Sequence, residues 1–201
     1  MPARHPRKRL IRLLQRAHAG ERAAALAYRG HWKSAADPAE RAQILRIEEE
    51  EWHHRDLLRQ MLAGLEAAPS GPREALALCV GSVLGPLCHV SGWLLPMYVA
   101  ALLETQNVRE YETAAALARL ADRVDLAPCL LDMARVEVEH EAFFHGRVAG
   151  HRLGRLLPGV LRAASAPGMG EWVSAPLREH TPPDPPGRER RHPRRADPAR
   201  V

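Results

Sequence analysis

Two stretches of the sequence place a glutamate and a histidine three residues apart, as Glu51 with His54 and as Glu137 with His140. On a helix, residues i and i+3 lie on the same face, so both side chains of a pair can reach one point. Imidazole and carboxylate ligands together favour a transition metal such as iron over magnesium or calcium. Each pair is therefore predicted to form half of a metal site.

The residues around each pair indicate whether it faces the core, because a lone Glu-x-x-His is common on solvated helix faces. Both pairs continue an apolar series with helical spacing, through Ile47, Glu51, His54, Leu58, Met61 and Leu65 in one segment and through Leu130, Met133, Glu137, His140 and Phe144 in the other. Both pairs are therefore expected to point inward. Glu50 and His53 form an overlapping pair, but the apolar series favours Glu51 and His54. The unused partners are expected on the solvated surface.

Two further glutamates occupy comparable inward positions, Glu21 within residues 14–28 and Glu104 within residues 97–111. Four carboxylates in one core cost several kcal/mol each unless cations neutralise them. One Glu from each of two helices and a Glu-x-x-His from each of two others is the ligand set of di-iron and di-manganese carboxylate bundles. The predicted metal ligands are Glu21, Glu51, His54, Glu104, Glu137 and His140, and no separate catalytic residue is assigned.

Helices are the elements expected to position these ligands. Ala, Leu, Arg and Glu dominate, aromatic residues make up 4%, and no alternating Val/Ile/Thr-rich stretch occurs, so an all-α fold is predicted. A chain of 201 residues suits one domain with a real core. Asp37 and Pro38 are typical of a helix start, and Gly30 of a helix stop. The first three expected bundle helices cover about residues 9–29, 38–66 and 93–120. The fourth is expected to start at a cap region, residues 125–128, and to end near residue 153.

Residues 75–103 contain no Asp, Glu, Lys or Arg. This uncharged stretch is longer than the roughly 20 residues that cross a bilayer, so one interpretation is a transmembrane helix. The other is an apolar helical element that ends near His89, followed by a break and the third bundle helix. Gly81, Gly85, Pro86, Gly92 and Pro96 favour the second interpretation, in which the apolar element contacts a membrane without spanning it.

The two ends of the chain differ from its centre. Residues 1–8 are expected to form a basic arm, residues 9–164 the bundle, and the Pro- and Arg-rich residues 165–201 a disordered tail. Charge alone fits an anionic membrane surface and nucleic acid equally well. The three cysteines lack CxxC spacing and no signal-peptide core is present, so a reducing, cytoplasmic compartment is expected.

Several of these motifs resemble the demethoxyubiquinone hydroxylase family, the ferritin-like di-iron monooxygenases of ubiquinone synthesis. The resemblance covers about residues 12–150 and is carried by His18-Ala19-Gly20-Glu21, Tyr28-x-Gly30, Glu51 with His54, Gly81-x-x-Leu84-Gly85, Gly92, Met97, Glu104 and Glu137-Val138-Glu139-His140. The chain departs from the family at Ala17, at Thr105 and at residues 93–96. The family's last membrane-associated helix is reduced to about residues 156–164.

The resemblance implies a ferritin-like four-helix bundle with an additional apolar, membrane-contacting helix. It further implies two iron ions per chain, O₂ as co-substrate, electrons from NADH directly or through the quinol, and a prenylated demethoxy-benzoquinol as substrate. A peripheral position on the cytoplasmic face of the inner membrane is expected, with a homo-oligomer or a quinone-synthesis complex as partner and no nucleic acid.

The roles of some polar side chains near the predicted ligands stay open. His18, Tyr28 and Tyr111 are candidates for contacts behind the ligands, with plain core packing as the alternative for the tyrosines. His89 and His145 are interpreted as structural or surface residues. An alternative function is a ferritin-like di-metal oxidase or iron-binding protein that acts on another substrate, and a further one is a helical membrane-surface or nucleic-acid-binding protein whose Glu and His residues are incidental.

Overall fold

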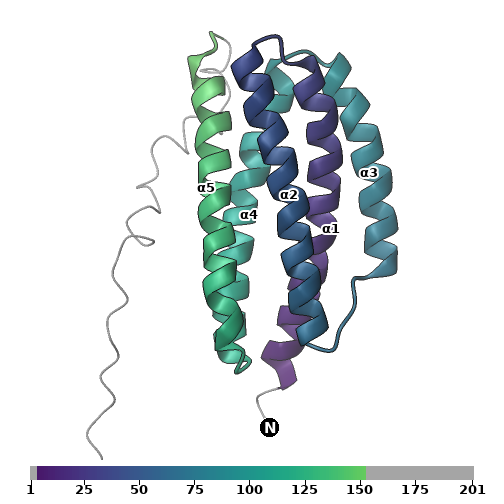
Figure 1. Cartoon of the computed structure of the whole chain (residues 1–201), viewed down its shortest axis with the longest axis vertical. Helices are drawn as coiled ribbons and strands as arrows, with labels where there is room; N and C mark the ends of the chain where they lie inside the picture. The colour runs from purple at the N-terminus through teal and green to yellow at the C-terminus, as the bar shows by residue number, and fades with distance from the viewer. Residues whose placement is uncertain (1–3, 153–201) are drawn as a thin grey trace, which may run out of the picture. The chain divides into compact units, whose positions relative to one another are not determined.

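The computed structural model describes residues 4–152, which are helical and contain no strand (Figure 1). The helices are α1 (Arg4–Ser34), α2 (Pro38–Gly64), α3 (Gly71–Val90), α4 (Leu94–Leu120), the short 3₁₀ helix η1 (Val124–Leu126) and α5 (Ala127–Gly150). This arrangement confirms the all-α prediction.

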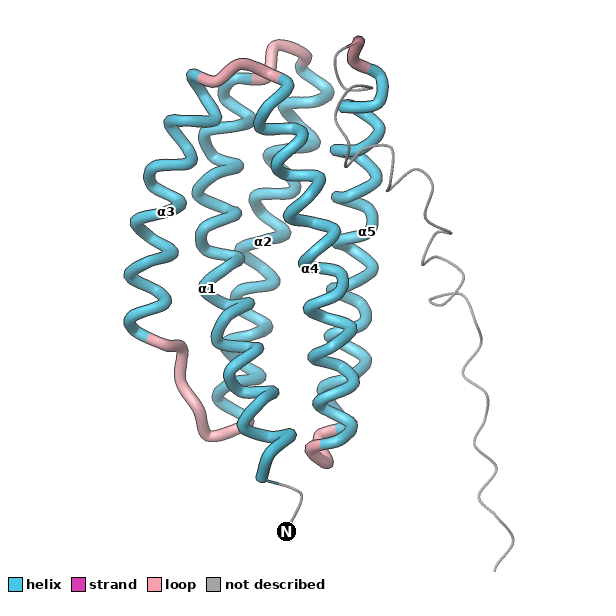
Figure 2. The backbone as a smooth tube through the Cα atoms, turned by 180° about the vertical axis from the view of Figure 1, so that it is seen from behind, coloured by secondary structure: helices cyan, strands magenta, loops and turns pink. Residues whose placement is uncertain are grey.

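Four of the long helices form a bundle, and the fifth lies against its outside. Helices α1 and α2 pack as one antiparallel pair, α4 and α5 as another, and α1 also contacts α4. Helix α3 packs mainly along α1, on the outside of the bundle (Figures 1 and 2). The structure therefore has the predicted four-helix bundle with one additional helix.

The interior of the bundle contains two separate apolar clusters. The first gathers around Leu14, Leu58, Tyr111 and Leu130, and the second around Tyr28, Ile47, Met97 and Phe144. On each bundle helix, the residues between the two clusters include the buried acids and histidines of the predicted site. A polar layer therefore separates two apolar cores.

Local signals explain the start of α2 but not the end of α1. Asp37 caps α2 by accepting a hydrogen bond from the Ala39 backbone N–H at 2.9 Å, as predicted. The predicted stop at Gly30 is wrong, because α1 continues to Ser34. Gly30 instead allows α1 to approach α3, since a Cβ atom there would lie 1.8 Å from the Gly85 carbonyl oxygen.

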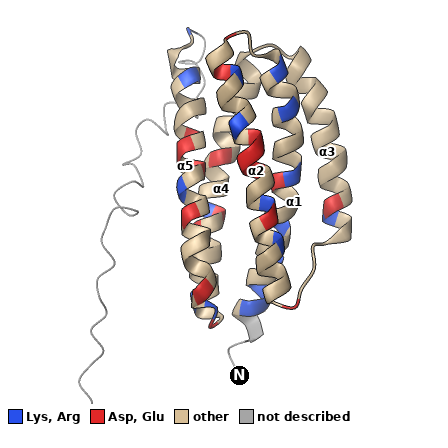
Figure 3. Cartoon of the chain, viewed as in Figure 1, with Lys and Arg blue, Asp and Glu red and all other residues tan. Residues whose placement is uncertain are grey.

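The uncharged stretch is divided between two helices, which excludes one helix over residues 75–103 and confirms the predicted break. Helix α3 ends at Val90, and the chain turns through Gly92, whose φ of +83° suits a residue without a Cβ, before α4 begins. By length and composition alone, α3 is the one described helix that could cross a membrane. Most of its length carries no charge (Figure 3).

The start of α5 differs from the expectation. Asp125 does not cap this helix, because its carboxylate accepts hydrogen bonds from Arg123 at 2.9 and 2.8 Å, and α5 begins at Ala127 after η1. The helix ends at Gly150, before the expected end near residue 153. The predicted remnant helix at 156–164 and the tail at 165–201 lie outside the described residues.

Candidate metal centre

The six predicted ligands meet in the polar layer at the centre of the bundle. Glu21 comes from α1, Glu51 and His54 from α2, Glu104 from α4, and the last pair from α5. Each of the six side chains is at most 3% exposed. Helical spacing places the two members of each Glu-x-x-His pair on the inward face of one helix.

The ligand atoms form two overlapping groups, each of which could hold a metal ion. One group contains Glu21, Glu51, His54 and Glu137, and the other contains Glu51, Glu104, Glu137 and His140, with the atoms of each group within 4.8 Å of one another. We call them the Glu21–His54 half-site and the Glu104–His140 half-site. Glu51 and Glu137 belong to both, as bridging carboxylates between two cations would.

The hydrogen bonding of these groups fits a cation. Both carboxylate oxygens of Glu51 and of Glu137, one oxygen of Glu21, and Nδ1 of His54 and of His140 are buried without a hydrogen-bond partner. His54 Nδ1 does lie 2.8 Å from Glu137 Oε1, but without hydrogen-bond geometry. Unsatisfied buried polar atoms are costly, and lone pairs that converge in this way are satisfied together by a shared metal ion.

Buried acids outside the layer are satisfied in a different way. Glu48 accepts hydrogen bonds from Arg29 Nε at 2.9 Å and from Trp32 Nε1 at 2.8 Å. Glu40 accepts one from Trp93 Nε1 at 2.8 Å and lies 3.4 Å from Arg147. These two acids have cationic and indole partners, whereas the acids of the layer face mainly one another.

Two tyrosines hold the outer carboxylates in a reciprocal arrangement. Tyr28 of α1 donates to Glu104 of α4, and Tyr111 of α4 donates to Glu21 of α1. Asn107 adds a hydrogen bond to Glu104 Oε2 at 3.1 Å. Burial, and then the charge of the nearest carboxylate, raises the pKa of both phenols well above its usual value, so they remain donors. Both tyrosines therefore contact predicted ligands as well as the apolar clusters.

Burial and mutual repulsion perturb the pKa values of the acids in the layer. Burial, followed by the charge of Glu137, raises the pKa of Glu51 and of Glu104 well above the usual range. Burial acts on Glu137 in the same direction, but the neighbouring rings of His140 and His54 outweigh it and lower its pKa. A cation that enters the layer would therefore compete with protons for Glu51 and Glu104.

The structure favours the predicted register of the second helix. His53 is exposed, whereas Glu51 and His54 are buried. Glu50 is partly exposed, as expected for a surface residue, but it also accepts a hydrogen bond from His140 Nε2 at 2.7 Å, which was not expected. Neither this contact nor that of Asn107 was predicted, although Asn107 lies three residues after Glu104 and so on the same helix face.

His18, a candidate for contact with a ligand, has other partners. Its Nδ1 lies 2.6 Å from Glu74 Oε1 on α3, and Arg55 donates to its backbone carbonyl at 2.8 Å. Burial outweighs the contact with Glu74 and lowers the pKa of His18. His18 thus ties α1 to α2 and α3 one turn away from Glu21.

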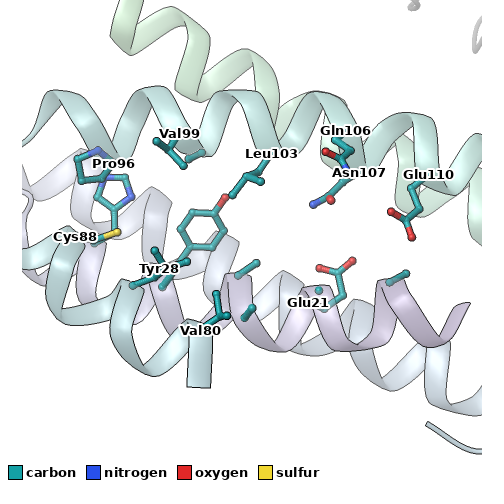
Figure 4. A pocket seen from close by; sticks show the side chains of 18 of the residues that line it. Glu21, Tyr28, Val80, Cys88, Pro96, Val99, Leu103, Gln106, Asn107 and Glu110 are labelled. Carbon is teal, nitrogen blue, oxygen red and sulfur yellow. The ribbon is translucent and has the colours of Figure 1, made fainter. Parts of the chain in front are cut away.

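A pocket of about 310 Å³ lies beside the layer, lined by α1, α3 and α4. Figure 4 shows Glu21, Gln106, Asn107 and Glu110 towards one end of it. Mostly apolar side chains line the rest, among them Val80, Val99, Leu103 and Pro96. The pocket is therefore suited to a molecule with a polar head and an apolar body.

Comparison with known proteins identifies the family. Residues 8–116, just over half of the chain, match the family described as ubiquinone biosynthesis protein COQ7. The match includes Glu21, Glu51, His54 and Glu104 but ends before α5, so the inclusion of the last Glu-x-x-His pair rests on the geometry. No curated protein and no solved structure matches the chain. The chain therefore belongs to the COQ7 family of demethoxyubiquinone hydroxylases, a family of enzymes of ubiquinone biosynthesis.

Proposed function

We propose that the protein is a di-iron monooxygenase that hydroxylates the ring of a prenylated demethoxy-benzoquinol. The observation that carries the proposal is the pair of overlapping Glu/His groups with unpartnered ligand atoms. Membership of the COQ7 family supports a role in ubiquinone biosynthesis. The amphipathic pocket beside Glu21 supports a substrate with a polar ring and a prenyl chain.

The six side chains would hold two iron ions, and Glu51 and Glu137 belong to both half-sites. Bound iron would supply the reduction of O₂. In the overall reaction, one atom of O₂ would enter a ring C–H bond as a hydroxyl group and the other would leave as water, with two electrons from NADH, directly or through the quinol, and two protons. The reciprocal bonds from Tyr28 and Tyr111 fix the outer carboxylates, so the ligands are oriented before a metal binds.

We place the enzyme at the surface of the membrane, on the cytoplasmic face. Helix α3 exposes Leu76, Val83, Leu87 and Val90, each at least 49% accessible, on a helix that packs against α1. Val99 and Leu103 of α4 are also partly exposed and line the pocket. A prenyl chain could therefore pass from the lipid between α3 and α4 without crossing water.

Iron binding tests the metal site. After anaerobic reconstitution with ferrous iron, we expect about two irons per wild-type chain and a large loss in Glu137→Ala. Glu139 is exposed on the same helix, so Glu139→Gln is the matched control and should retain the metal. A wild-type chain that binds no iron would exclude the proposal.

The quinone content of cells tests the reaction. Cells that lack the gene should accumulate a demethoxy-quinone, and the wild-type protein and the exposed-site variant His53→Ala should remove it. His54→Ala and His140→Ala should not. An unchanged quinone profile, together with two bound irons, would instead assign a ferritin-like oxidase with another substrate.

A further inference from the structure

His140 is held between the centre of the bundle and a carboxylate outside it. Its Nε2 donates to Glu50 Oε2 at 2.7 Å. Its Nδ1 lies 3.4 Å from Glu51 Oε1 and 3.4 Å from Glu137 Oε2, the two shared carboxylates. The ring thus connects Glu50, whose side chain is 34% exposed, to the fully buried layer.

This hydrogen bond fixes which ring nitrogen is available to a metal. When Nε2 carries the proton that Glu50 accepts, the lone pair of Nδ1 is directed towards the shared carboxylates. A carboxylate behind a ligating imidazole holds the ring orientation and makes the ligand more basic. Glu50 itself lies 3.6 Å from Arg46, one turn earlier on α2.

The other half-site is not supported in the same way. His54 Nδ1 lies 2.8 Å from Glu137, and its ring forms a T-shaped contact with the ring of Tyr111, with centroids 5.8 Å apart. Among the described residues, the only carboxylate paired with His54 is Glu137, a ligand of the layer itself. The two half-sites therefore have matching ligands but unequal surroundings.

We propose that Glu50 is a positioning residue that makes the Glu104–His140 half-site the tighter of the two, so that this half-site fills first. The proposal rests on the proposed di-metal function and assigns Glu50 a role that the Glu-x-x-His spacing does not give it. It acts through His140 and touches no substrate. The loss of such an outer partner commonly costs 10- to 100-fold in metal affinity.

The test is an anaerobic titration of the metal-free chain with Co²⁺ in the presence of a competing chelator. Visible absorption monitors the binding, and the titration is then repeated with Fe²⁺. We expect two binding events in the wild type. In Glu50→Ala the tighter event should weaken about 10- to 100-fold while the other is unchanged. Glu50→Gln keeps an acceptor oxygen without the charge, so its affinity in the tighter event should lie between those of the wild type and Glu50→Ala. Glu49→Ala, an exposed neighbour, should match the wild type.

A double substitution assigns the affected half-site. His140→Ala should remove the same event, and adding Glu50→Ala to it should change nothing more, because Glu50 acts only through that ring. The Co²⁺ absorption spectrum of the affected event should also change in Glu50→Ala, which a loss of overall stability would not produce.

Each remaining outcome contradicts a specific statement. Identical titrations of the wild type and Glu50→Ala would overturn the role of Glu50 and leave the di-iron function intact. Equal weakening of both events would overturn the assignment to one half-site. A wild-type chain that binds neither metal would instead contradict the proposed function.

Discussion

The buried histidine His31 shows how this core treats a titratable side chain that has no acidic partner. It is 2% exposed, and its ring packs against both Tyr28 and Phe144, with centroids 6.3 and 5.9 Å away. Burial lowers the pKa of His31 to about 4. The ring is therefore neutral at physiological pH, and it lines the pocket beside the metal layer.

Replacement of His31 should remove part of the acid sensitivity of the fold. The folded pKa lies below the usual 6.5, so the unfolded chain takes up the proton first, and stability is lost as the pH falls from 6.5 towards 4. Between pH 7 and pH 5 the wild type should lose about 2 kcal/mol more than His31→Phe. Urea unfolding in the presence of a chelator measures the difference.

The control for this prediction is the exposed His53. His53→Gln should show the same pH dependence as the wild type, because its side chain is solvated. An equal loss of stability in the wild type and His31→Phe would show that His31 does not contribute.

At the scale of residues, spacing predicted the six central side chains because the helical period alone determines which residues face inward. Contacts between helices that are distant in sequence were not predictable in this way. The bond from His140 to Glu50 depends on how α5 is rotated against α2, and the reciprocal bonds of Tyr28 and Tyr111 depend on how α1 crosses α4.

At the scale of elements, the contact between α1 and α3 depends on glycine. A Cβ atom at Gly81 would lie 2.7 Å from the Leu26 Cβ, and one at Gly85 would lie 2.8 Å from the Leu26 carbonyl oxygen. Together with Gly30, these positions let the two backbones approach closely, as small residues spaced four apart do in helix pairs. Helix α3 can therefore bury a narrow face while its large apolar side chains point outward.

Gly30→Ala should disrupt this contact. The added methyl group would meet the backbone of Gly85, which cannot move like a flexible side chain, so we expect a loss of about 1–3 kcal/mol in the free energy of unfolding. Gly146→Ala on α5 has open space around it and should gain up to about 1 kcal/mol from helix propensity. Denaturant unfolding of the two variants gives the comparison. An equal gain in both would contradict the packing role of Gly30.

Some sequence signals predicted the helix ends correctly and others did not. Asp37 followed by Pro38 forms the predicted cap, because this signal is local and needs no partner. Gly30 and Asp125 were misinterpreted because each has a partner that its own residue type does not reveal: Gly30 lies against the distant α3, and the Asp125 carboxylate pairs with the guanidinium of Arg123.

At the scale of the whole molecule, the exposed apolar surface of α3 and α4 adjoins the pocket. The exposed apolar residues of α3 and of the first half of α4 include Val80, Val99 and Leu103, which also line the pocket. Exposed apolar surface of this extent is typical of contact with a membrane or a protein. In the proposed function it lies on lipid and receives the prenylated substrate.

Vesicle binding tests this surface. Val83 on α3 and Val124 in η1 are 66% and 62% exposed, so the same substitution by Glu can be compared at both. With vesicles of phosphatidylethanolamine and phosphatidylglycerol, we expect Val83→Glu to bind several-fold less in co-sedimentation and Val124→Glu to match the wild type, because only the former would have to place its carboxylate against lipid. Equal binding by all three proteins would contradict a membrane role for α3.

In the proposed function, the polar layer between two apolar cores would also link the amount of folded protein to the iron supply of the cell. A ligand that binds only the folded state stabilises it by mass action, so iron in the layer would raise the stability of the chain with the free iron concentration. In an iron-starved cell, four buried carboxyl groups would face one another at the centre of the bundle. The unfolded fraction exposed to proteases would then grow, and quinone synthesis would decline with iron supply even at a constant rate of translation.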